Sequence, residues 1–266
     1  MTMKIFINLL AIVQKELQSY FASPLAFSIA TVFWLISGIF FIFYLFSQGG
    51  IIQSVAVQEQ LGETLPVDVV YEFMQIFFNT IASLSLFILP ILSMGLYSEE
   101  RKRGTIELLA TSPLFNWVVA TGKLIGVLLF FTIMILPILL YEIIVFPSAS
   151  PPISLQVPFL AHFGLILLAG AILSMGMFIS SLTESSVFSA IMTFTLVVIL
   201  SILDAIAGLI SGEIGEFIGH FSLLKNYEVF VRGVFDSGSL IVFLSYIFLG
   251  IFLTSQSIET LRFSRK

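Results

Sequence analysis

The residues best suited to charge-based chemistry lie in one short segment, residues 97–114, between two long apolar stretches. Within it, Glu99 and Glu100 precede Arg103 by four and three residues, the spacings at which side chains meet along a helix. A charged segment held between two apolar walls favours docking of a protein partner. The alternative is an ordinary topogenic loop, for which the basic residues 101–103 would be sufficient.

The second half of this segment predicts a short helix that follows a break. Gly104 and Thr105 interrupt the charged run, and Thr105 is a suitable N-cap for a helix that begins near Ile106. Ser112 and Pro113 then end that helix, because proline disfavours the helical conformation of the residue before it.

Several classes of catalytic and cofactor-binding site are excluded by the sequence. There is no cysteine and there are two histidines, His162 and His220, which make a weak basis for a metal site. The Gly122-Lys123 pair is followed by leucine and lacks the upstream glycine of a phosphate-binding loop. No zinc-type His-Glu-x-x-His motif is present. We therefore expect a chain that is not an enzyme and that holds no cofactor or metal.

A few polar residues stand alone within apolar stretches, where charge is costly. For Lys123 we favour a stem that snorkels to the interface over a substrate or ion contact. For Asn79 we favour an interhelical hydrogen bond over a transport role. Glu142 and His162 lie near the outer ends of neighbouring spans, where they could pair or relay protons, although interface solvation explains both.

The elements that must position these residues are membrane-spanning helices. The hydrophobic fraction is 58%, the charged fraction is 10% and the mean hydropathy is +1.11, whereas soluble domains carry about 25% charged residues. Stretches of about 20 residues without charge match the hydrocarbon thickness of a bilayer. These properties predict an all-α polytopic membrane protein. Six spans are expected, at Leu25–Phe46, Ile76–Tyr97, Val118–Tyr141, Pro158–Ser180, Val187–Leu203 and Leu240–Thr254.

An amphipathic helix is expected before the first span, over residues 4–21. Its apolar residues recur at helical spacing, which is typical of a helix lying in the membrane interface. Glu16 falls close to the apolar stripe, so we expect this carboxylate to have a partner. We call this predicted element the elbow helix.

The basic residues predict which side of the membrane each loop occupies. Lys225 and Arg232 are the two on the proposed outside. The others lie on the proposed inside: Lys4, Lys15, Arg101, Lys102, Arg103, Lys123, Arg262, Arg265 and Lys266. This bias places both termini in the cytoplasm.

The chain reads as one membrane domain, residues 1–266, without internal repeats. Residues 204–239 are ambiguous, because 205–210 extend the fifth apolar run and 214–224 are semi-apolar. We interpret 204–239 as short helices that dip into the outer interface.

The charged segment resembles that of the ABC-2 permease family, which shares an acidic-basic-Gly-Thr-x-Glu-Leu-Leu-x-Thr-Ser-Pro stretch after the second span. The matching residues are Glu99, Glu100, Arg101, Gly104, Thr105, Glu107, Leu108, Leu109, Ser112 and Pro113, followed by Gly122-Lys123. Further similarity is found in Lys15-Glu16-Leu17, Tyr20-Phe21, Ser23-Pro24 and Phe230–Asp236. Within the family, the chain is most similar to the small permeases associated with gliding motility and with nitrous-oxide-reductase maturation.

This resemblance implies a plasma-membrane permease subunit that pairs with a separate cytoplasmic ABC ATPase, which would bind the ATP and Mg²⁺. Residues 98–114, Arg103 included, would be the coupling segment, and Lys15, Glu16 and Glu184 would form a second ATPase contact. For Glu184 a solvated turn, and for the other two residues a place at the lipid headgroups, are the alternatives. The permease would act as a homodimer or with a related chain, most simply as an exporter, in contact with lipid and not with nucleic acid.

A second hypothesis belongs to a different class. The same ATPase coupling could drive a mechanical or scaffolding complex that signals to an extracytoplasmic partner and moves no solute. The outer loops 47–75 and 204–239 would then be the docking surfaces.

Overall fold

The computed structural model describes residues 2–48, 50–60, 69–106, 114–148, 154–210 and 212–263, and every secondary-structure element within them is a helix. Six of the helical segments are long and apolar enough to cross a membrane, which confirms the predicted fold class. Their helices are α2 (Pro24–Phe46), α4 with α5 (Val69–Ser93 and Gly95–Lys102), α7 with α8 (Asn116–Ile135 and Ile138–Val145), α9 (Gln156–Leu182), α10 (Ser186–Leu209) and α13 (Ser237–Phe263).

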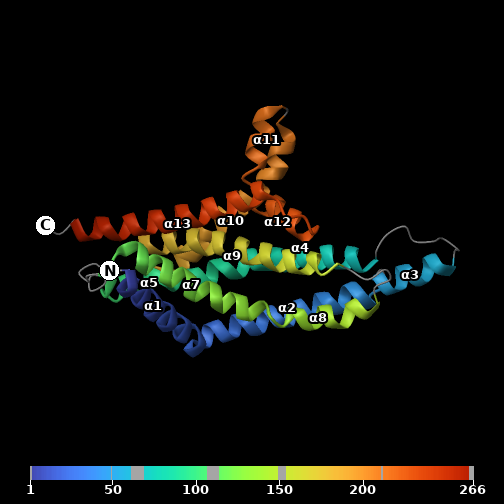
Figure 1. Ribbon diagram of the computed structural model, residues 1–266, viewed down its shortest axis with the longest axis horizontal. Coiled ribbons are helices and arrows are strands. Elements are labelled where there is room, and N and C mark those ends of the chain that lie inside the picture. The colour runs from blue at the N-terminus through green and yellow to red at the C-terminus, as the bar shows by residue number, and fades with distance from the viewer. Residues whose placement is uncertain are drawn as a thin grey trace.

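The observed spans differ from the predicted ones mainly in length. The fifth continues six residues beyond its predicted end at Leu203, and the sixth begins at Ser237 and is helical to Phe263. The predicted fifth span stopped before Asp204, although apolar residues continue after it, and the predicted sixth span left out the polar residues at the ends of α13. The spans run along the long axis of the molecule, and the start of α1 and the end of α13 lie at the same end of the bundle (Figure 1).

Helix α9 is the centre of the bundle, and it packs against α4, α5, α7, α10, α12 and α13. In its most apolar window 72% of the residues are buried, against 17% for α10 and 22% for α13. Small residues permit this central position, since a Cβ on Gly170 would lie 2.9 Å from Ile247 Cδ1. Across the same seam, a Cβ on Gly250 would lie 2.7 Å from Ser174 Cβ. The helices α9 and α13 therefore approach closely, as small residues allow in membranes.

Two spans are interrupted near a proline. Helix α4 contains Pro90 and gives way to α5 at Met94, and α7 gives way to α8 around Pro137. Proline removes a backbone donor and clashes with the preceding turn, which explains the interruption around Pro137. The break at Met94 lies four residues after Pro90, and the Ser93 hydroxyl donates to the Pro90 oxygen there, at 3.1 Å. The break at Met94 supplies backbone groups to the site described below.

The predicted elbow helix is present as α1 (Thr2–Ala22), which lies obliquely across one end of the bundle (Figure 1). It is followed by a sharp turn, in which the Ser23 hydroxyl accepts a hydrogen bond from the Ala26 amide and Pro24 occupies the first helical position of α2. Ser23 and Pro24 thus act as an N-cap and N1 pair. We call this end of the bundle the α5 end.

The opposite end carries the short elements α3 (Ile51–Gln60), η1 (Phe146–Ser148), α11 (Glu213–Gly219) and α12 (Leu223–Val231). Within the described part of residues 204–239 lie the short helices α11 and α12, and their place at the outer interface stays a prediction. Tyr227 and Phe230 are fully buried, and α12 packs against α9 and α4. Helix α11 stands out from the bundle (Figure 1).

Candidate coupling site

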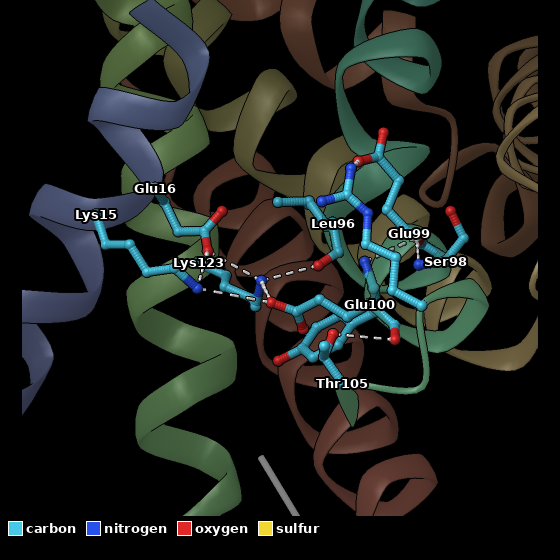
Figure 2. A network of polar contacts seen from close by, with 11 residues as sticks. Lys15, Glu16, Leu96, Ser98, Glu99, Glu100, Thr105 and Lys123 are labelled. Carbon is cyan, nitrogen blue, oxygen red and sulfur yellow. Dashed lines mark hydrogen bonds and ion pairs between the residues drawn. The ribbon is translucent and has the colours of Figure 1, made fainter. Parts of the chain in front are cut away.

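Lys123 lies at the centre of a buried polar cluster at the α5 end. Its Nζ atom is 2.9 Å from Glu16 Oε1, 2.9 Å from Glu100 Oε1 and 2.9 Å from the Leu96 carbonyl oxygen. These three acceptors match the three donors of an ammonium group. Figure 2 shows Glu16 reaching this point from α1, Lys123 from α7 and Glu100 from α5.

The cluster is balanced in charge. Lys15 Nζ approaches Glu100 Oε1 at 3.8 Å, so that two ammonium groups face two carboxylates. The Lys123 ammonium also lies 5.0 Å from the centre of the Tyr97 ring, close enough for a cation–π contact. This arrangement fulfils the expectation that Glu16 has a partner.

The interpretation of Lys123 as a snorkelling residue is wrong. Its side chain is 3% exposed and ends in the cluster instead of emerging at the interface. A single sequence could not reveal this, because both carboxylates that hold it come from other helices, 107 and 23 residues away.

Two glycines in α7 bring α1 close enough for Glu16 to reach Lys123. A Cβ on Gly122 would lie 2.7 Å from Ile12 Cγ2, and one on Gly126 would lie 2.7 Å from Glu16 Cβ. Their spacing of four residues places both on one face of the helix, where small side chains permit close packing.

The helix break at Met94 exposes carbonyl groups that side chains from other helices satisfy. The Leu92 oxygen accepts from Tyr20 Oη at 2.6 Å, and the Met94 oxygen accepts from Ser180 Oγ at 2.7 Å. With Lys123 bound to Leu96, three helices thereby donate to this junction. Unsatisfied buried carbonyls would be costly, so these contacts fix the position of the break.

Tyr20 is held in its neutral form. Burial, and then the carboxylates of Glu16 and Glu99, raise the pKa of Tyr20 well above its ordinary value. Its hydroxyl therefore remains a hydrogen-bond donor to the Leu92 oxygen across the physiological pH range.

The charged residues of α5 are the helical end of the second span. Glu99 Oε2 lies 3.6 Å from Arg103 Nη2, so one predicted ion pair forms at the surface. Glu100 instead turns toward the buried Lys123. The two adjacent carboxylates thus have different partners because they lie about 100° apart around the helix.

Gly104 ends α5 with a positive φ of 70°. The amide of Gly104 donates to the Arg101 oxygen at 3.1 Å and the amide of Thr105 donates to the Glu100 oxygen at 2.9 Å. This pair of bonds is a Schellman cap, for which glycine is the preferred residue. The Thr105 hydroxyl also donates to the Glu100 oxygen, at 3.2 Å, and so acts on the helix before it.

The turn 181–186, between α9 and α10, lies against α5. Arg101 Nη1 donates to the Ser181 oxygen at 2.7 Å, and Ser98 Oγ is 2.8 Å from Ser186 Oγ. Glu184, at the tip of the turn, is exposed. The structure therefore brings the turn of Glu184 beside the first half of the charged segment.

The remaining predicted coupling residues, Glu107, Leu108, Leu109, Ser112 and Pro113, lie outside the described residues. The predicted short helix after Ile106 lies there too. The coupling role of these residues, and the helix itself, stay predictions.

The family model of ABC-2 family transporter proteins matches residues 10–258. The chain belongs to this family. No curated protein matches the sequence significantly.

Other predicted polar residues of this ABC-2 permease lie away from the cluster. Asn79 is half-buried in α4, and within the described chain its amide makes no hydrogen bond to another helix. Glu142 Oε1 and His162 Nδ1 lie 3.4 Å apart, and the same nitrogen is 2.9 Å from the Pro158 oxygen. The structure brings this pair together, and a proton relay through it stays a hypothesis.

The sequence did not indicate the serine and tyrosine contacts of the ABC-2 site. Tyr20 joins α1 to the end of α4, Ser180 and the Ser181 carbonyl join α9 to α5, and Ser98 joins α5 to the start of α10. Serine is common in membrane helices, and its partners here are mostly backbone atoms, which no sequence pattern encodes. The four serines among residues 180–186 were the available signal.

Proposed function

We propose that this ABC-2 permease is driven by a separate cytoplasmic ATPase, which docks at the α5 end. In this proposal the cluster of Glu16, Lys123 and Glu100 transmits the movement of the docked ATPase to the spans. The chain would lie in the plasma membrane with both termini in the cytoplasm. The observation that carries the proposal is the position of Lys123, which ties α1, α5 and α7 together at one buried point.

The proposed docking surface consists of three neighbouring segments. Helix α5 presents the exposed pair Glu99–Arg103, α1 presents the exposed Lys15, and the turn 181–186 presents Glu184. Residues 107–113 would complete this surface. Charges of both signs suit a protein partner whose own surface is mixed.

Transmission follows from the hydrogen bonds already described. Helix α5 continues α4, it is tied to α9 through Ser180 and to the turn before α10 through Ser186, and it reaches α1 and α7 through Lys123. A push on α5 would therefore shift several spans as packed bodies rather than bend one loop. Such rigid shifts are a common form of switching in proteins.

The transport pathway would form between two permease subunits, either two copies of this chain or this chain and a relative. Helix α10 supports this, because only 17% of the residues in its most apolar window are buried within one chain. We propose export as the direction, by analogy with the gliding-motility and nitrous-oxide-reductase-maturation permeases that the sequence resembles.

Exchange of Gly104 tests the coupling proposal. Gly104→Ala places a side chain where φ is 70°, which costs about 1–2 kcal/mol for an L-residue, and so displaces the end of α5. We expect the variant to bind the co-expressed ATPase, but ATP hydrolysis in proteoliposomes to lose its dependence on the permease. Gly208→Ala is the matched control, because Gly208 lies inside α10 and a Cβ there meets nothing within 4 Å. Unchanged coupling in Gly104→Ala, or purification of the permease without any ATPase, would contradict the proposal.

A further inference from the structure

A hollow at the α5 end lies on the membrane-facing side, between α7 and α13. It has a volume of 540 Å³ and shares no lining residue with the Lys123 cluster. Its walls belong to the ends of two membrane spans, Asn116–Val145 and Ser237–Thr260. The hollow is therefore open to the lipid layer at that side of the membrane.

The α13 wall changes from apolar to polar along the membrane normal. Phe248, Ile251 and Phe252 line its deeper part, and Ser255, Gln256 and Glu259 line the part nearer the end of the helix. These residues lie on one face, since each one after Phe248 follows another of them by three or four positions. From Phe248 to Glu259 the face extends about 16 Å at 1.5 Å per residue, which is close to the thickness of one leaflet.

The α7 wall adds aromatic rings at the level of the polar part. Phe115 and Trp117 are 47% and 50% exposed, and their rings are stacked with centroids 6.5 Å apart. The face of an indole ring attracts ammonium groups. Among the described residues that line the hollow, Glu259 is the charged one, and its charge is negative.

We propose that this hollow binds one phospholipid with an amine headgroup, such as phosphatidylethanolamine, from the leaflet at the α5 end. The acyl chains lie along Phe248, Ile251 and Phe252, and the headgroup ammonium lies between Glu259 and the face of Trp117. An aromatic wall beside a carboxylate is complementary to a cation and repels an anionic headgroup. The inference needs only the membrane insertion of the chain, so it is independent of the ATPase partner.

Trp117 provides a direct reporter once Trp34, the other of the two tryptophans, is exchanged for phenylalanine, which removes the hydrogen bond from Trp34 Nε1 to the Met134 oxygen. In a Trp34→Phe background, the full chain is placed in nanodiscs that contain brominated phosphatidylethanolamine or brominated phosphatidylglycerol at equal mole fraction. We expect quenching of Trp117 fluorescence to be about two- to fivefold more efficient with the ethanolamine lipid, the range typical of an exposed ammonium contact. Native mass spectrometry of the protein with both tryptophans gives a second readout, as retained phosphatidylethanolamine.

Glu259→Gln removes the charge and keeps the shape, and it should bring the quenching ratio to about one and reduce the retained lipid. Glu213→Gln is the matched control, since Glu213 is an exposed carboxylate on α11, away from the hollow. Equal or stronger quenching by the glycerol lipid would overturn the proposal. It would also be overturned by an unchanged ratio in Glu259→Gln, or by a Trp117 that a second subunit shields from both lipids.

Discussion

At the residue scale, a lysine buried among helices is stable only when its charge is compensated. Desolvation of an ammonium costs several kcal/mol, which close carboxylates and good hydrogen bonds offset. Lys123 has both, with acceptors at 2.9 Å on three sides. Removal of one charge from the cluster should therefore destabilise the protein more than removal of all three charges.

Removal of Lys123 alone tests this interdependence. Lys123→Met leaves the carboxylates of Glu16 and Glu100 without their shared cation, and we expect a loss of about 3–5 kcal/mol of stability. The triple variant Lys123→Met/Glu16→Gln/Glu100→Gln removes all three charges and should recover most of that loss. Thermal unfolding of the purified protein in detergent measures both.

An exposed ion pair supplies the control for these variants. Arg232 Nη2 lies 2.6 Å from Glu228 Oε1 on the surface of α12, so Arg232→Met should change the melting temperature little. A triple variant as unstable as Lys123→Met would show that packing of the lysine stem, and not charge compensation, dominates. In the ATPase assay the triple variant should stay uncoupled, because the tie between α1, α5 and α7 is gone.

Asp236 gives a prediction on pH. Its Oδ2 accepts the Ser239 amide at 2.6 Å and caps α13, and this hydrogen bond lowers the pKa of the Asp236 carboxyl. A lowered folded-state pKa adds stability at pH values above the ordinary aspartate pKa of about 4, and that stability is lost as the pH falls through the folded pKa. Asp236→Ala should cost about 0.5–2 kcal/mol at pH 7 and less at pH 3.

Asp236→Asn is the control for that titration, since it keeps an oxygen acceptor without a titrating charge. Its stability should be close to that of the unmodified protein at pH 7, with a smaller dependence on pH. Melting temperatures at the two pH values measure this. An equal deficit of Asp236→Ala at both would contradict the assignment of the cap.

At the element scale, the approach of α1 to α7 decides whether Glu16 can reach the cluster. A Cβ on Gly126 would lie 2.7 Å from Glu16 Cβ, so Gly126→Ala must push α1 away by a few tenths of an ångström or more. We expect a lower melting temperature and weaker coupling to the ATPase. Gly208→Ala again controls for the general effect of alanine, which favours a helix over glycine.

The outcome for Gly126→Ala distinguishes two roles of the contact between α1 and α7. Loss of stability with intact coupling would mean that α1 serves only to cover the bundle. Loss of coupling in a variant that still folds would support α1 as part of the transmission path. Crosslinking between cysteines introduced on α1 and α7 measures their separation directly.

At the scale of the whole molecule, the two ends of the bundle are expected on opposite sides of the membrane. The chain has no cysteine, so single cysteines can be introduced without any background. Glu184 and Ser237 are both exposed, the first at the α5 end and the second at the opposite end. In sealed right-side-out vesicles, we expect an impermeant maleimide to label Ser237→Cys at once and Glu184→Cys only after lysis. The reverse order would contradict the proposed orientation.

The sequence was sufficient for the helical fold class, the six spans and the family. These properties depend on composition and local spacing: about 20 apolar residues in a row, glycine after a charged helix end, and a Ser-Pro pair before a span. The sequence also predicted the elbow helix and the exposed Glu99–Arg103 pair, because both depend on residues spaced three or four positions apart along one helix.

The tertiary structure decided what single polar residues do. Lys123 was expected at the interface and lies in a buried cluster, and α12, expected as a short interfacial helix, buries Tyr227 and Phe230 against the spans. In both cases the deciding neighbours are distant in sequence: Glu16 is 107 residues from Lys123, and Tyr227 Oη contacts the Phe78 oxygen across 149 residues. A sequence pattern records the period and polarity of each helix but not which faces of different helices meet, and burial of a charge depends on that meeting.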